Sequence, residues 1–179
     1  MGQSLGVSYQ TVNSYLDYLD GAFLIRRLHS YQANIAKRLV KRPKLYWRDS
    51  GLLHALLNVA DRDLLLAQPR VGASWEGFVI EQAIGQLNVS DRAFVPYYFQ
   101  TSDQIELDLV LDFGAERWAI EIKLTSAPGT EDFRALDRAA DLIGASRRFL
   151  ISQTKNVVDD GKRASVGLER FLESLAESG

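Results

Sequence analysis

The spacing of apolar residues divides the second half of the chain into helices and strands. Apolar positions three and four residues apart predict helices, whereas alternation or a short apolar run predicts strands. The predicted elements are helices over 73–87, 131–143 and 168–175, and strands over 94–100, 105–112, 117–124 and 148–152. Their order predicts an α/β or α+β unit, a mixed sheet flanked by helices.

The first 60 residues follow a different pattern. Ser8 is placed to cap a helix, and the preceding Leu5-Gly6-Val7 predicts the end of a shorter helix and a tight turn. The apolar face of the capped helix comprises Val12, Tyr15, Leu16 and Leu19. Two helices joined in this way predict a helix-turn-helix, and two short apolar runs around a basic segment predict the strands of a wing. We expect a winged helix-turn-helix that begins abruptly, as in a fragment of a longer protein.

A break in the pattern separates the two parts. Asp61 is placed to cap a short helical turn, and Pro69 and Gly72 then interrupt the helical spacing. The predicted domains are a winged helix over 1–60, truncated at its start, a linker over 61–71, and the mixed-sheet unit over 72–179.

Composition indicates a soluble globular protein. Of 179 residues 46% are hydrophobic and 25% are charged. No apolar run approaches the roughly 18–20 residues that span a bilayer, and the N-terminus lacks the features of a signal peptide. We therefore expect a cytoplasmic protein with no membrane partner. Because the chain has no cysteine, disulfides, thiolate metal sites and a cysteine nucleophile are excluded.

Charge is divided unevenly along the chain. Residues 1–50 carry eight Lys or Arg and three Asp, whereas the remainder carries 13 basic and 20 acidic residues. Six of the bases fall close together: Lys37, Arg38, Lys41, Arg42, Lys44 and Arg48. Such a run predicts salt-dependent binding to nucleic-acid phosphates. It equally suits a solvated face or a dock for an acidic part of a longer protein.

Two carboxylates and a lysine are candidates for chemistry. Asp108 and Glu121 lie on neighbouring predicted strands, and a short connection containing Gly114 makes those strands a plausible antiparallel hairpin. The polar side chains are expected on one face, with Ile105, Leu107, Leu109 and Leu111 on the other. Paired carboxylates suit a hard divalent cation such as Mg²⁺ or Mn²⁺, and Lys123 beside them is placed to hold water or to steady charge on a phosphoryl oxygen.

Glu76 is a third acidic candidate. It heads the apolar stripe of the helix over 73–87, where an unpaired buried charge would be costly. Either it joins the other carboxylates at a metal site, or it lies in the first helical turn and interacts with the helix dipole.

The acids and lysine match a known signature. Asp108 and, thirteen positions later, Glu121-Ile122-Lys123 resemble the motif of the PD-(D/E)XK, or restriction-endonuclease-like, superfamily over residues 72–152. The resemblance implies that Asp108, Glu121 and Glu76 hold Mg²⁺ or Mn²⁺ and that Lys123 activates water for phosphodiester hydrolysis. A salt bridge between two surface strands is the structural alternative.

A longer succession of motifs resembles the C-terminal region of predicted prokaryotic AAA-type ATPases, which is a domain of unknown function. The matching segments include Thr11-Val12, Lys37-Arg38-Leu39-Val40, Pro43–Leu52, Gly72–Glu76, Glu106–Leu111 and Ala119–Lys123. The resemblance implies a winged helix followed by a nuclease-like domain, with an ATPase module upstream as partner. The chain itself has no G-x-x-x-x-G-K-[ST] motif, so we expect no ATP site and no ATPase activity in it.

Two functions follow from these observations. The first is a metal-dependent nuclease whose winged helix binds nucleic acid. The second is a catalytically silent recognition or assembly module of the parent ATPase, which the acidic second half favours because a nuclease cleft usually needs positive walls.

Overall fold

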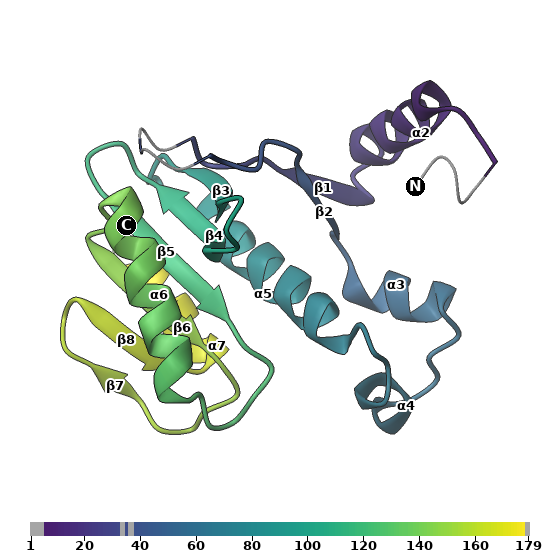
Figure 1. Ribbon diagram of the computed structural model, residues 1–179. Helices are drawn as coiled ribbons and strands as arrows, with labels where there is room; N and C mark the ends of the chain where they lie inside the picture. The colour runs from purple at the N-terminus through teal and green to yellow at the C-terminus, as the bar shows by residue number, and fades with distance from the viewer. Residues whose placement is uncertain (1–5, 33–34, 36–37, 178–179) are drawn as a thin grey trace.

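The computed structural model describes residues 6–32, 35 and 38–177, in which a six-stranded mixed sheet lies between helices (Figure 1). The N-terminal helices and strands are α2 (Tyr9–Gly21), β1 (Ile25–Leu28), β2 (Lys44–Trp47), α3 (Ser50–Leu56), α4 (Arg62–Leu66) and α5 (Val71–Asn88). They are followed by β3 (Val95–Gln100), β4 (Glu106–Asp112), β5 (Arg117–Ile122), α6 (Thr130–Ile143), β6 (Arg147–Ile151), β7 (Val158–Asp159), β8 (Arg163–Val166) and α7 (Leu168–Glu177).

The sheet has the order β3-β4-β5-β6-β8-β7. Strand β4 is antiparallel to both β3 and β5, whereas β5, β6 and β8 run parallel to one another, and β7 is antiparallel to β8. Helix α6 covers one face, and α5 and α7 cover the other (Figure 1). The predicted mixed α/β sheet flanked by helices is therefore confirmed.

Strands β7 and β8 were not predicted from the sequence. Strand β7 has only two residues, too few to show a period, and β8 joins the parallel part of the sheet, where both faces are covered. The signal that remains is the Asp160-Gly161 turn between them, in which Gly161 has a φ of +84°.

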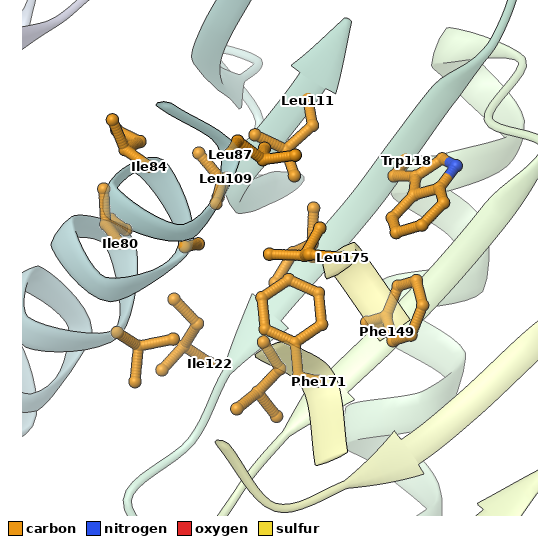
Figure 2. Close-up of a cluster of buried hydrophobic side chains, with 14 of the residues drawn as sticks. Ile80, Ile84, Leu87, Leu109, Leu111, Trp118, Ile122, Phe149, Phe171 and Leu175 are labelled. Atoms are coloured by element: carbon orange, nitrogen blue, oxygen red, sulfur yellow. The ribbon is translucent and has the colours of Figure 1, made fainter. Parts of the chain in front are cut away.

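The larger core cluster lies between the sheet, α5 and α7 (Figure 2). Phe171 of α7 is fully buried, and its ring lies 5.0 Å from that of Phe149 on β6. Phe149 in turn lies 5.1 Å from Trp118 on β5. These rings extend the core from α7 across two central strands, so the C-terminal helix is an integral layer of the fold.

The N-terminal part contains the predicted capped helix and a two-stranded hairpin. The Thr11 backbone N–H donates to Ser8 Oγ at 3.1 Å, which confirms the cap on α2, and β1 pairs antiparallel with β2. Helix α2 has no buried residue, however, and Tyr15 of its predicted apolar face is exposed. The shorter preceding helix falls mainly on residues 1–5, outside the described residues.

The connection between β1 and β2 runs along the edge of the large sheet. Tyr98 on β3 donates its backbone N–H to the carbonyl of His29 at 3.0 Å, and Val40 donates to the carbonyl of Gln100 at 2.9 Å. This pairing covers an edge strand that would otherwise be open to association. It also fixes the β1–β2 hairpin beside the second half of the chain.

No helix in the described part of the chain is long and apolar enough to cross a membrane.

Candidate active site

An irregularity in β4 positions Asp108. The register between β3 and β4 shifts so that Asp108 and Leu109 together lie opposite Tyr98. Leu107 consequently packs with Val110 on the α6 side of the sheet, and not with Leu109 as strict alternation predicted. Such bulges redirect individual side chains, and here the affected residue is the acid of the predicted signature.

Asp108 is a buried carboxylate at the point where β4 and β5 separate. Its exposed fraction is 6%, and its Oδ2 accepts a hydrogen bond from the Ile122 backbone N–H at 2.9 Å. Burial raises the pKa of Asp108 well above its ordinary value, and the charges of Glu121 and Glu76 raise it further. The site therefore holds an acid that is costly to ionise unless a cation compensates it.

Glu121 on β5 and Lys123, which directly follows the last residue of that strand, complete the predicted signature. Glu121 is 4% exposed, and its Oε1 lies 2.7 Å from Lys123 Nζ. The other oxygen, Oε2, is buried and has no hydrogen-bond partner within the described structure. Burial raises the pKa of Glu121, although Lys123 opposes this shift. Lys123 is itself partly buried, yet its hydrogen bond and ion pair with Glu121 raise its pKa.

Glu76 approaches the same acids from α5. The helix begins at Val71 and has no acid in its first turn, so the helix-dipole explanation for Glu76 is wrong. Its Oε1 instead accepts a hydrogen bond from the Tyr46 hydroxyl and lies 3.4 Å from Lys44 Nζ. Burial and the charge of Glu76 together raise the pKa of the Tyr46 hydroxyl. The hydroxyl therefore stays protonated and donates its hydrogen bond to Glu76.

Lys44 links two of the acids. Its Nζ lies 3.6 Å from Asp108 Oδ1 as well as 3.4 Å from Glu76 Oε1. Burial lowers the pKa of Lys44, but the neighbouring carboxylates outweigh burial and the net shift is upward. The ammonium is therefore a charged part of the acidic cluster.

Sequence reasoning missed Lys44 and Tyr46 as members of this site. They lie on β2, which reaches the acids only because the hairpin packs against α5. A Cβ added at Gly77 would lie 3.2 Å from Tyr46 Cδ1, so the glycine permits this close approach. Gly77 one position after Glu76 was the one local signal, and it does not identify the partner.

Each of the three acids faces a lysine in this structure, because Lys44 lies between Glu76 and Asp108 and Lys123 lies beside Glu121. Among the described residues, no three His, Cys, Asp or Glu side chains are gathered closely enough to hold a metal ion together. Asp108 and Glu121 nevertheless have the chemistry that a hard divalent cation requires, because both are buried carboxylates and Glu121 Oε2 has no hydrogen-bond partner among the described residues. These two carboxylates therefore suit a divalent cation, which would have to replace the Lys44 ammonium beside Asp108.

Comparison with known families assigns the two parts of the chain. Residues 1–63 match the domain of unknown function DUF8612, and residues 71–171, more than half of the chain, match the domain of unknown function DUF4143. The chain belongs to the DUF4143 family. DUF4143 is found C-terminal to AAA ATPase domains in some proteins, so the resemblance to a domain of unknown function in the C-terminal region of AAA-type ATPases is confirmed at the level of the family.

Two relatives of this DUF4143 protein are the uncharacterized proteins Mb2031c of Mycobacterium bovis and Rv2008c of Mycobacterium tuberculosis. Each is 39% identical over 161 residues, which cover 86% of this chain and 36% of the relative. The chain thus spans about a third of the length of these relatives.

The predicted basic run of this DUF4143 chain divides into two groups. Arg38, Lys41 and Arg42 are exposed, whereas Lys44 and Arg48 are half-buried. Arg48 Nε lies 3.7 Å from a carboxylate oxygen of α5, and Lys44 lies among the acids described above. Lys37 falls outside the described residues. Of the described members of the run, the exposed group remains the candidate for binding phosphates.

The raised pKa of Asp108 predicts a pH-dependent gain of stability on replacing it with asparagine. A carboxyl whose pKa is higher in the folded state favours folding below its unfolded pKa and loses that contribution as pH rises through the folded value. Asp108→Asn should therefore be more stable than wild type by on the order of 1 kcal/mol at pH 8. The difference should shrink towards pH 4, measured by urea unfolding across the pH range.

Asp160 provides a control in which the change of stability with pH is expected to have the opposite sign. It is exposed, and its pKa is lowered by hydrogen bonds from the backbone N–H groups of Arg163 and Lys162. Asp160→Asn should lose stability near neutral pH and approach wild type in acid. Equal behaviour of the two variants would contradict the assigned environment of Asp108.

Proposed function

We propose that the chain carries a Mg²⁺- or Mn²⁺-dependent phosphodiesterase site that cleaves nucleic acid. One observation carries the proposal: Asp108 and Glu121 are buried on adjacent strands. Glu121 Oε2 has no hydrogen-bond partner among the described residues, and Lys123 Nζ lies 2.7 Å from Glu121 Oε1. A structural salt bridge needs only one acid for its lysine. The second buried carboxylate raises the cost of the arrangement unless a cation binds there.

Each residue then has a chemical role. Asp108 and Glu121 would hold the divalent cation, together with the backbone carbonyl of Ile122. Glu76 would join them once the cation replaces the Lys44 ammonium that now lies between Glu76 and Asp108. When bound, the cation supplies positive charge to the phosphoryl oxygens and lowers the pKa of water. Lys123 orients the attacking water and donates a hydrogen bond to the negative charge that develops in the transition state. The carboxylate of Glu121 keeps the Lys123 ammonium in position.

The substrate would reach the site across the first half of the chain. Arg38, Lys41 and Arg42 are exposed on the segment that runs along β3, the strand paired with β4. Their charges suit the phosphates of a bound strand, and helix α2 with the β1–β2 hairpin would form the parts of a winged helix that contact nucleic acid. In a longer protein, an AAA-type ATPase module upstream would move the nucleic acid or drive the assembly of the protein.

A second candidate function is a silent recognition or assembly module of that ATPase. The observation that favours it is that four aromatic side chains of the N-terminal part are exposed: Tyr9, Tyr15, Tyr18 and Phe23. Exposed aromatic residues at this density are typical of protein contacts. In that function Lys44 permanently neutralises Glu76 and Asp108, and no cation is required.

Incubation with single- and double-stranded DNA and RNA distinguishes these functions. We expect cleavage products on denaturing gels with Mg²⁺ or Mn²⁺, none with EDTA, and none with Asp108→Asn. Cleavage that persists in Asp108→Asn would indicate a contaminating nuclease and overturn the assignment. Absence of cleavage with every substrate and metal would favour the assembly module.

A further inference from the structure

Lys44 enters the acidic cluster from a different part of the chain. The acids lie on α5, β4 and β5, whereas Lys44 lies on β2 of the N-terminal hairpin. Its Nζ is within 3.4 Å of Glu76 Oε1 and 3.6 Å of Asp108 Oδ1, so one ammonium serves both carboxylates. Both oxygens belong to residues that would hold a divalent cation in the proposed function.

We propose that Lys44 is a tethered cation that occupies the metal site and is displaced when a divalent cation binds. The N-terminal hairpin thereby sets the affinity of the site for metal. This inference rests on the proposed function, because it concerns the same carboxylates.

Competition follows from charge and from shared oxygens. An ammonium and a divalent cation cannot both approach Glu76 Oε1 and Asp108 Oδ1 without strong repulsion in a site with little water. The ammonium is a compact charge on a flexible four-carbon stem, so it can leave the carboxylates while β2 stays in place. The side chain of Lys44 is 27% exposed, so its ammonium can move outward into solvent.

Tyr46 fixes the orientation of the Glu76 carboxylate. Its hydroxyl donates to the same Glu76 oxygen that faces Lys44, and its ring is buried against α5. Displacement of Lys44 therefore leaves Glu76 with a neutral donor that fixes its orientation. The two neighbouring residues of β2 have different roles: Lys44 supplies a movable charge and Tyr46 supplies a fixed hydrogen bond.

Titration calorimetry with Mn²⁺ tests the inference on the full chain. Lys44→Gln should bind Mn²⁺ roughly tenfold more tightly than wild type, since one competing positive charge has been removed. Lys162→Gln is the matched control, because Lys162 is an exposed lysine in the turn between β7 and β8. It changes the net charge equally and should leave the Mn²⁺ affinity within about twofold of wild type.

A second measurement uses the unmodified protein and does not depend on the folding of a variant. Lysine acetylation by a small acylating reagent, followed by mass spectrometry, reports how free each ammonium is. Lys44 should be acetylated more rapidly with Mn²⁺ than without it, whereas the rate at Lys162 should not change.

The outcomes separate this inference from the proposed function. If Mn²⁺ binds, Asp108→Asn abolishes binding, and Lys44→Gln has unchanged or weaker affinity, then Lys44 is no competitor and the metal site stands. Unchanged reactivity of Lys44 with bound Mn²⁺ overturns the inference in the same way. If neither wild type nor Lys44→Gln binds Mn²⁺, both the metal site and its tethered competitor are overturned.

Discussion

Replacement of Lys123 by methionine is expected to lower the rate of metal-dependent phosphodiester hydrolysis by about 10²–10³-fold. Methionine keeps most of the apolar stem but removes the ammonium that lies 2.7 Å from Glu121 Oε1. The group that orients water and stabilises developing charge is then lost, while the carboxylates remain. Single-turnover cleavage of a labelled oligonucleotide measures the effect.

The loss should fall on the chemical step. Because the ammonium acts on charge that appears in the transition state, kcat should fall while KM and Mn²⁺ affinity change little. Lys162→Met removes an exposed lysine and serves as the control, with activity equal to wild type. A Lys123→Met protein with full kcat, or one whose defect is repaired by more metal, would contradict the role assigned to Lys123.

Replacement of Phe171 by alanine is expected to destabilise the fold by about 3–5 kcal/mol. Phe171 has no exposed surface and lies 5.0 Å, ring to ring, from Phe149 in the centre of the larger core (Figure 2). Its removal leaves a cavity between α7 and the sheet that these rigid neighbours cannot fill. Urea unfolding followed by tryptophan fluorescence measures the loss, because Trp118 lies in the same cluster.

Glu173→Ala on the same helix is the matched control. Glu173 is exposed, and its ion pair with Arg170 is a surface contact worth about 0–1 kcal/mol. If Phe171→Ala costs no more than this control, α7 is not the structural layer described above.

Most of the sheet was predictable from the sequence because its strands are short apolar runs and its helices carry apolar residues three and four positions apart. The predicted strand over 105–112 differs from β4 by one residue, and the helix over 131–143 differs from α6 by one. The prediction for β4 was wrong about Leu107, whose side chain lies on the opposite face of the sheet from Leu109. A period of two cannot reveal a bulge, since the register shift depends on how β3 pairs with β4.

Some residues of the candidate site were likewise predictable from the sequence, and others were not. Asp108, Glu121 and Lys123 were found because their spacing along two adjacent strands fixes their proximity. Lys44 was assigned to phosphate binding, because a basic run shows only its charge. Its ion pairs with Glu76 and Asp108 depend on the packing of a hairpin against a helix thirty residues away in sequence.

The mixed sheet, its flanking helices and the closeness of Asp108, Glu121 and Lys123 along one hairpin and its end follow from the amino-acid sequence. Local periodicity and residue spacing are sufficient for these features, because each depends on neighbours along the chain. Only the packing of distant segments shows that Asp108 and Glu121 are buried, that one Glu121 oxygen has no hydrogen-bond partner in the described part of the chain, and that Lys44 neutralises two acids. Burial and long-range ion pairs arise only when distant segments pack together, and they control the charge of this site.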